Sequence, residues 1–181
     1  MAMGRAMEDV IITASTGTAY TGETGSGTES AQTAIAASVG TGTGLNITKL
    51  RTAKELLDKA DVDPSIPRHV VCGPEQITNL LGTTEVTSSD FNTIKALVHG
   101  EVDSFLGFKF TTSNRLAKSG NDRTCIAYAQ DGITLGIGKD ISARIDERAD
   151  KSYATQVYYC QSIGATRMEK AKVVPITCTE A

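Results

Sequence analysis

Glycine-rich segments are the first places where this 181-residue chain has residue types that could bind a ligand. Gly40, Gly42 and Gly44 resemble the start of a dinucleotide-binding loop, but the third glycine comes one residue early and no convincing strand precedes them. The segment LGIGKD around Lys139 lacks the spacing of a phosphate-binding loop, and no clear helix follows it. A flexible joint is therefore the better interpretation of the three glycines.

The histidines and the acidic residues also fall short of a catalytic or metal-binding arrangement. His69 and His99 have no carboxylate pattern nearby and lie at a predicted strand start and a predicted helix end, which favours structural roles. The charged run from Asp146 to Lys151 alternates in sign, which is typical of a solvated turn or a subunit contact. No GxSxG motif occurs. The sequence thus predicts no catalytic, cofactor-binding or metal-binding residues, and no cofactor.

Composition narrows the function further. The chain has 18 basic and 21 acidic residues, a formal charge of −3, so there is no basic excess for bulk nucleic-acid binding. No apolar run approaches the roughly 18–20 residues that span a bilayer, and the N-terminus lacks the residue order of a signal peptide. The cysteines are far apart and form no CxxC pair, which favours buried free thiols and a reducing cytosol. They are Cys72, Cys125, Cys160 and Cys178.

The segment from residue 46 to residue 60 predicts the longest helix, around which the rest of the chain is organised. Its apolar residues recur at three- and four-residue steps and share one face: Ile47, Leu50, Ala53, Leu57 and Ala60. Asn46 occupies the N-cap position. Asp63-Pro64 ends the helix, because the residue before a proline is pushed to extended geometry.

Further helical and turn segments surround this helix. RAMEDVIITA near the N-terminus is helix-like, a Gly/Thr/Ser-rich turn region follows it, and AQTAIAASV at 31–39 is either a short helix or a short strand. Pro74 suits the first position of a short helix through Leu81, and Gly82 suits its left-handed end residue. A further helix is predicted from Ser88 or Ser89, carrying apolar residues up to residue 98.

The apolar period changes from helical spacing to two beyond Val102, which predicts strands. The strands predicted there are 106–112, 125–129, 133–137, 141–145, 154–168 and 173–178, and a short strand at 69–72 is predicted before them. The fold class is therefore α+β, with two or three helices followed by mainly antiparallel strands.

Two long stretches of the chain resemble the major capsid (coat) proteins of tailed bacteriophages. They are LRTAKELLDKADVDPSIPRHVVCGPEQITNLLGTTEVTSSDFNTIKALVHGEVDSFLGFKFTTSNRL and AYAQDGITLGIGKDISARIDERADKSYATQVYYCQSIGATRMEKAKVVPI. The resemblance runs from about Met3 to Cys178 and is distributed rather than confined to one motif. Its most specific segments are Asp63-Pro64 with His69 to Pro74, Gly100 to Phe110, and Ser162 to Glu169.

The resemblance implies the Hong Kong-phage-type capsid fold, with a peripheral domain and an axial domain. The peripheral domain would carry a long spine helix at 46–60, whose apolar face would pack on a long sheet at 154–168. The implied boundaries are 1–64 for the N-terminal part of the peripheral domain, 65–150 for the axial domain, and 151–181 for strands that return to the peripheral domain.

The function that the resemblance implies is structural. The chain would be a coat subunit of a phage or prophage, assembling into the pentamers and hexamers of an icosahedral shell that encloses DNA without sequence-specific binding. Its partners would be further copies of itself, scaffolding protein and portal protein, with no membrane, and its location the virion, assembled in the host cytoplasm. Family members normally begin with an N-terminal arm and a long extended loop. This chain begins at the RAMEDVIITA segment, so we expect both to be missing.

Two other classes of function stay open from the sequence alone. A decoration or binding module of a phage particle would be all-β, whereas the sequence predicts three helices between Asn46 and Gly100. A soluble enzyme would bring Lys139, His69 or Asp131 into a cleft lined by perturbed ionisable groups. The absence of a complete catalytic motif favours the structural protein.

Overall fold

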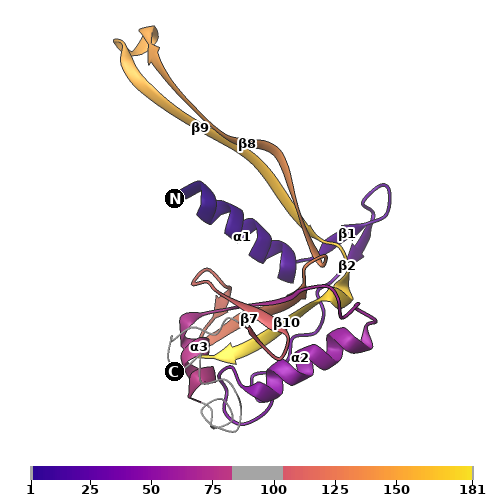
Figure 1. Ribbon diagram of the computed structural model, residues 1–181. Coiled ribbons are helices and arrows are strands. Elements are labelled where there is room, and N and C mark those ends of the chain that lie inside the picture. Colours follow the sequence, from indigo (N-terminus) through magenta and orange to yellow (C-terminus); the bar gives the residue numbers. More distant parts are fainter. Residues whose placement is uncertain (1, 83–103, 181) are drawn as a thin grey trace.

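A body of helices and strands carries a long projecting two-stranded ribbon, as Figure 1 shows. The computed structural model describes residues 2–82 and 104–180. The fold is α+β, as the sequence predicts. The helix predicted near residues 88–98 and His99 lie outside the described residues. No described helix is both long and apolar enough to cross a bilayer.

A six-stranded sheet forms the centre of the body, in the order β10-β7-β3-β5-β4 with β6 paired to β7. All of its pairings are antiparallel except that of β3 with β5. Burial alternates along β3, where Val70 and Cys72 are buried and Val71 between them is less so. The strands are β3 (Arg68–Cys72), β4 (Ser104–Phe105), β5 (Phe108–Thr112), β6 (Lys118–Ser119), β7 (Asp122–Ala129) and β10 (Val173–Thr179).

Helix α2 (Ile47–Lys59) confirms the amphipathic helix predicted at 46–60. Asn46 caps it, because the side-chain oxygen accepts a hydrogen bond from the backbone N–H of Lys49 at 2.9 Å. The face that the spacing predicts is fully buried at three positions: Leu50, Ala53 and Leu57.

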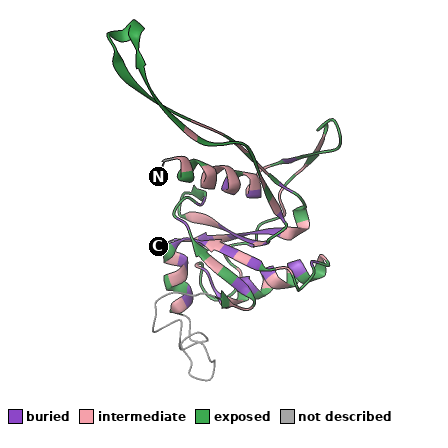
Figure 2. Cartoon of the chain, turned by 45° about the horizontal axis from the view of Figure 1, so that its top comes forward, coloured by how far each residue is buried: buried purple, intermediate pink, exposed green. Residues whose placement is uncertain are grey.

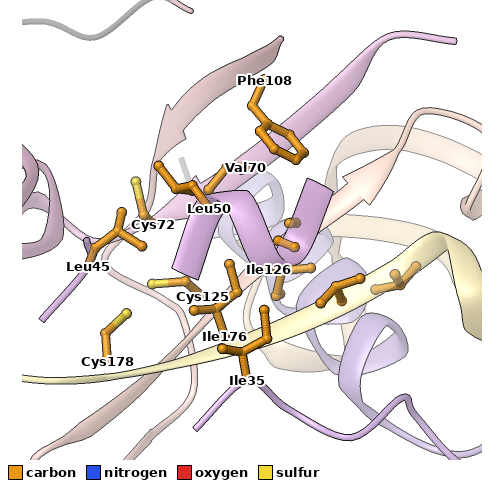
Figure 3. Packing of buried hydrophobic residues seen from close by; sticks show 14 of the residues in the cluster. Ile35, Leu45, Leu50, Val70, Cys72, Phe108, Cys125, Ile126, Ile176 and Cys178 are labelled. Atoms are coloured by element: carbon orange, nitrogen blue, oxygen red, sulfur yellow. The ribbon is translucent and has the colours of Figure 1, made fainter. Parts of the chain in front are cut away.

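The packing partner predicted for this helix is wrong. Helix α2 contacts β10 of the body, whereas the long strand β9 (Ala154–Arg167) contacts helix α1 (Ala2–Thr16). Figure 3 shows Leu50 among Val70, Phe108 and Ile126 of the body sheet. An apolar helical stripe shows that one face is buried, but it does not show which surface buries it.

Two further expectations about loops need correction. Helix α3 (Pro74–Leu81) begins at the proline as predicted, but Gly82 ends it with right-handed geometry, φ −77° and ψ −8°, and its N–H bonds to the carbonyl of Thr78 at 3.0 Å. Residues 31–39 form neither the helix nor the strand considered. Ile35 makes an isolated bridge to Ile176 of β10, which holds this segment against the sheet edge.

The ribbon consists of β8 (Ile133–Arg148) and β9, paired antiparallel and joined by the short 3-10 helix η1 (Ala149–Lys151). Strand β9 confirms the long strand predicted at 154–168. Strand β8 is continuous where the sequence predicts two strands, and register shifts between Ile137 and Ser142 absorb its extra residues. The charged run predicted as a turn begins inside β8, and only its second half turns the chain.

The base of the ribbon is the part that joins it to the rest of the molecule. Helix α1 lies along the ribbon, in contact with β9 and more weakly with β8 (Figure 1). A small hairpin, β1 (Ala19–Thr21) and β2 (Gly27–Glu29), projects beside it. Figure 2 shows the contrast in burial, since buried residues concentrate in the body while the ribbon is mostly exposed.

The cysteines are free thiols, and three of them belong to the core of the body: Cys72, Cys125 and Cys178. This confirms buried thiols at these positions, whereas Cys160 in the ribbon is only partly buried. Burial raises the pKa of Cys72 to about 12. Figure 3 shows the three sulfur-bearing side chains in one region, next to Leu45.

Charged groups are also buried in the body, each with partners. Lys49 is fully buried, and its ammonium group donates to the carbonyls of Thr43, Gly44 and Thr177 at 2.8, 2.7 and 3.1 Å. Its three N–H donors are thereby all used. These bonds tie the loop before α2 to strand β10.

Glu180 is a buried carboxylate close to the end of the chain. It accepts hydrogen bonds from Arg123, from Lys118 at 2.5 Å and from Gln76 at 3.2 Å. The bonds from Arg123 and Lys118 lower the pKa of Glu180 to about 2. The network fixes the last described residues to β7, to β6 and to α3.

Candidate functional site

Nearly every residue in the outer part of the ribbon, 139–160, is exposed, and we call this part the outer ribbon. Only Ser142 and Cys160 in it are partly buried. Ile145 and Tyr153 are each 71% exposed. The exposed large apolar side chains of the outer ribbon are Ile141, Ile145, Tyr153, Val157, Tyr158 and Tyr159. Scattered exposed apolar residues are normal, but such a concentration on one projecting element marks an interaction surface.

The register of the two strands separates these side chains into two faces. Cross-strand partners share a face, and successive residues alternate between faces. One face, called the apolar face, carries the pairs Ala143–Tyr159 and Ile145–Val157, with Glu147–Thr155 beyond them. The opposite face, called the basic face, carries the pairs Lys139–Ser162, Ser142–Cys160, Arg144–Tyr158, Asp146–Gln156 and Arg148–Ala154.

The apolar face continues a surface that is already in use at the base of the ribbon. The register shifts add residues to β8 and none to β9, so alternation holds along β9, and Tyr159 and Val157 lie on the same face as Ile163, Ala165 and Arg167. These three inner residues are partly or fully buried, whereas the alternate residues between them are exposed. Helix α1 covers this inner half. The same face is therefore covered near the body and bare towards the tip.

Arg167 holds α1 against the ribbon. Its side chain is only 3% exposed and lies on the inner half of the apolar face, which α1 covers. Its guanidinium donates to the carbonyls of Ser15 at 3.1 Å and Gly17 at 2.9 Å, at the end of α1, and to that of Glu29 in β2 at 2.9 Å. A cation suits this place, because the last carbonyls of a helix have no partners within the helix and carry partial negative charge.

Helix α1 is also tied to the body on its other side. Asp9 pairs with the guanidinium of Arg115, and Glu8 accepts a hydrogen bond from the hydroxyl of Ser113. The bond from Arg115 lowers the pKa of Asp9. A groove of about 720 Å³ runs between α1 and the ribbon base, lined mainly by small residues such as Ala14, Gly17 and Ala165. The helix is thus the link that sets the direction of the ribbon relative to the body.

The glycine-rich segment before α2 does not have the geometry of a nucleotide loop. The carbonyls of Val39 and Thr41 accept bonds from the side-chain amide of Asn46, at 2.9 and 3.3 Å, and those of Thr43 and Gly44 accept from Lys49. A phosphate site needs inward-facing N–H groups, and here the carbonyls face the cations and amides. The segment is an anchored loop rather than the flexible joint predicted.

The three residues proposed for an enzyme belong to three different parts of the structure. His69 is in the central strand β3 and stacks on Tyr128, with ring centroids 5.5 Å apart and planes at 24°. Burial, with a smaller effect from the charge of Lys109, lowers the pKa of His69. Asp131 pairs with Lys172 at 2.7 Å in the turn before β8, and Lys139 is exposed on the ribbon. None of the three lines the groove between α1 and the ribbon base.

Among residues 2–82 and 104–180, no three His, Cys, Asp or Glu side chains are close enough to hold a metal ion. The lowered pKa values of the Asp9 and Glu180 carboxylates are explained by their ion pairs. Structural ion pairs perturb pKa values as active sites do, so these shifts do not indicate catalysis.

Sequence reasoning missed Arg167 and Lys49, the two buried cations that fix the ribbon and the loop before α2. A signal for Arg167 was present, because its alternation with Ile163 and Ala165 places a charge on the buried side of a strand. Lys49 likewise adjoins Leu50 and precedes Ala53 by one helical turn. A charge on an apolar stripe predicts burial with partners, although it does not identify the partners.

Comparison with known proteins finds one matching family model and several similar solved structures. A family model described as phage capsid protein matches residues 1–180. Among solved structures, a chain of Mycobacterium phage Che8 is 20% identical with a TM-score of 0.66, and the alignment covers 97% of this chain and 60% of that one. The capsid asymmetric unit of cyanophage Pam1 gives 13% identity, a TM-score of 0.72, and coverage of 99% and 66%.

The head structure of Helicobacter pylori bacteriophage KHP40 gives 11% identity, a TM-score of 0.68, and coverage of 99% and 66%. No curated protein sequence matches the chain. The chain therefore spans about three fifths to two thirds of the length of these structures. At such low identities the likeness to them shows a shared fold alone.

Proposed function

We propose that this chain, which belongs to the phage capsid protein family, is a structural subunit of a bacteriophage or prophage capsid. Its role is to associate with copies of itself into the pentamers and hexamers of an icosahedral shell around DNA, in the virion. The observation that carries the proposal is the outer ribbon, a projecting element with many exposed apolar side chains. The proposed role is architectural rather than enzymatic.

The outer ribbon requires neighbours for a physical reason. An isolated two-stranded ribbon is marginally stable in water, and additional strands or a covering layer are needed to stabilise it. Helix α1 supplies that layer only at the base. Shell subunits are held by modest contacts that symmetry repeats many times, so a bare ribbon in the free subunit suits a surface that is covered in the assembly.

We assign the parts of the Hong Kong-phage-type capsid fold differently from the sequence-based boundaries. The peripheral domain consists of α1 and the ribbon β8–β9, and the axial domain is the body around the six-stranded sheet. The support is that α1, rather than α2, packs on the long strands, while α2 packs on β10. Helix α1 is accordingly the candidate for the spine helix, in place of residues 46–60.

The remaining partners are proposed from the family alone. Scaffolding and portal proteins are the other proteins that a coat subunit meets during assembly. The enclosed DNA is held without sequence-specific contacts, and the net charge of −3 agrees with a wall that does not bind its cargo tightly.

Sedimentation velocity over a range of protein concentrations tests the proposal. We expect species much larger than the 19.1 kDa monomer, and the fraction of the protein in these species should increase as the concentration rises. A single monomeric species at every concentration, including in buffers that strengthen apolar association, would refute self-assembly by this chain.

A further inference from the structure

Lys49 is a fully buried cation, and none of the ion pairs among the described residues includes it. Its three hydrogen bonds go to the neutral carbonyls of Thr43, Gly44 and Thr177. A neutral amine has only two N–H donors, so three accepting carbonyls require the charged ammonium form. A buried charge without an opposite charge is costly, so an anion is expected nearby.

Cys178 is the acidic side chain that acts most strongly on this charge. The ammonium group donates to the carbonyl of Thr177 at 3.1 Å, directly before Cys178 in β10. Burial lowers the pKa of Lys49, and the charge of Cys178 is the strongest of those that oppose this effect. Cys125 and Asp122 oppose it more weakly, and Asp122 is only partly buried, so solvent screens its charge. Cys178 is fully buried and is therefore the better candidate for the counter-ion.

Cys125 is placed to stabilise a thiolate at Cys178. Strand β7 pairs with β10 so that Cys125 faces Ile176, and Cys178 is two residues further along the same face. The two cysteines are therefore diagonal neighbours across the pair of strands. Figure 3 shows their sulfur atoms turned toward each other. The S–H group of Cys125 donates a hydrogen bond to Cys178, which lowers the pKa of Cys178 and raises that of Cys125.

The other influences on Cys178 partly cancel. After the hydrogen bond from Cys125, burial has the next largest effect and raises the pKa of Cys178. The charge of Lys49 lowers this pKa, and the charges of Asp122 and Glu180 raise it. Glu180 acts weakly because two basic side chains of the body already pair with its carboxylate. The result is a pKa below the ordinary cysteine value of 9.0.

We propose that Cys178 is a buried thiolate that balances the charge of Lys49, and that peroxides oxidise Cys178 and Cys125 to a disulfide. The thiolate is the form of cysteine that attacks a peroxide. The attack breaks the O–O bond of hydrogen peroxide, converts Cys178 to a sulfenic acid and releases hydroxide, which solvent protonates. The thiol of Cys125 then attacks the sulfenic sulfur, and the departing hydroxyl leaves as water with the proton of that thiol. The two thiols lose two electrons in total, and hydrogen peroxide is reduced to water.

The position of β10 allows this bond to form. Diagonal neighbours start farther apart than directly opposite residues, and the bond brings the two sulfurs to about 2.05 Å. Strand β10 is at the edge of the body sheet, so it can shift without displacing strands on both sides. Both thiols are 0% exposed, so the reaction needs a local opening of this edge and a small reagent. We therefore expect slow but selective oxidation.

The disulfide would join β10 covalently to its neighbour β7. In reducing surroundings the two thiols stay free, and in oxidising surroundings the bond holds the edge strand in place. This oxidation site belongs to the folded body, so the inference stands or fails independently of self-assembly.

Peptide mapping after oxidation tests which thiols react. The full chain with Cys160→Ser, which removes the partly exposed ribbon thiol, is treated with hydrogen peroxide at neutral pH. Remaining thiols are alkylated in urea, and a tryptic digest places the three buried cysteines on separate peptides. We expect peptides linked through Cys125 and Cys178, about 2 Da lighter than the two reduced peptides together. Cys72, whose pKa burial raises to about 12, should be alkylated. A link between Cys72 and Cys125, or three alkylated thiols after prolonged oxidation, would overturn the proposal.

Ultraviolet absorbance of the thiolate tests the ion pair while Lys49 is still present. The Cys160→Ser protein should show one thiolate at neutral pH that is lost on unfolding in urea, where the pKa of Cys178 returns to its ordinary value of 9.0. Lys49→Met should slow peroxide oxidation about tenfold, the effect of one pKa unit, whereas Lys54→Met on the same helix leaves the rate unchanged. Absence of thiolate absorbance in the folded protein would show that Cys178 is not the counter-ion, and it decides the question if Lys49→Met does not fold. Equal oxidation rates in a folded Lys49→Met variant would contradict the ion pair.

Discussion

Replacing Arg167 by alanine is the sharpest test of how the ribbon is held. The guanidinium donates three hydrogen bonds to carbonyls at the end of α1 and in β2, within a site that is 3% exposed. Loss of a charged donor to a buried carbonyl costs about 1 kcal/mol or more per bond, so Arg167→Ala lowers the free energy of docking α1 on the ribbon by about 3 kcal/mol.

The expected result is local because these bonds lie outside the body sheet. Where amide exchange follows the equilibrium between closed and open states, a loss of about 3 kcal/mol corresponds to a roughly 150-fold faster exchange of amide hydrogens in α1 and β2. Hydrogen exchange followed by mass spectrometry measures this segment by segment. Amides of β7 and β10, in the core of the body, are expected to exchange at wild-type rates.

A matched arginine at the tip provides the control. Among the described residues, Arg148 forms an ion pair with Asp150 alone, at 2.5 Å in a solvated position. An exposed ion pair contributes about 0–1 kcal/mol, so Arg148→Ala leaves α1 exchange unchanged. If amide exchange in α1 were unchanged in Arg167→Ala, the claim that Arg167 holds α1 against the ribbon would be refuted. Equally faster exchange in β7 and β10 would show that Arg167 supports the whole fold instead.

Three more predictions concern buried polar groups and thiols. Lys49→Met removes three hydrogen bonds to backbone carbonyls, of which the Thr43 carbonyl still accepts one from the N–H of Thr179, and it lowers the free energy of unfolding in urea by about 2–3 kcal/mol. Lys54→Met on the same helix changes it by at most about 0.5 kcal/mol, and equal effects would contradict the account. The folded-state pKa of Glu180, about 2, is below its ordinary value of 4.5, so its contribution is complete above pH 4.5 and is lost as pH falls towards 2. Glu180→Gln therefore flattens stability against pH in that window, and an unchanged acid dependence would count against the network. Of the four cysteines only Cys160 reacts quickly with a thiol reagent in the native free subunit, and the buried three react after unfolding; fast native labelling of a second thiol would be inconsistent with the core.

Several elements of the body and of the ribbon follow from local patterns. Three local patterns each predict the element found: the helical stripe through Leu50 and Leu57, Pro74 at the start of α3, and the long run of strand-favouring residues in β9. Each depends on spacing within a few residues, which the sequence displays directly.

Which elements pack against one another could be learned only from the structure. The stripe of α2 is equally compatible with the long strands and with the body sheet, and only the contacts decide between them. The irregular stretch of β8 also required the structure, because Lys139 pairs with Ser162 and so lies on the face opposite to Ile137 and Ala143, although simple alternation would place all three together. Alternation read from the sequence of β8 alone loses its phase there.

Electron microscopy of the purified chain tests the central claim most directly. Negatively stained images of the protein, taken at concentrations where large species sediment, distinguish shells, rings and single subunits at once. The capsid role predicts closed shells or rings of five or six subunits. A field of uniform single subunits at every concentration would contradict it.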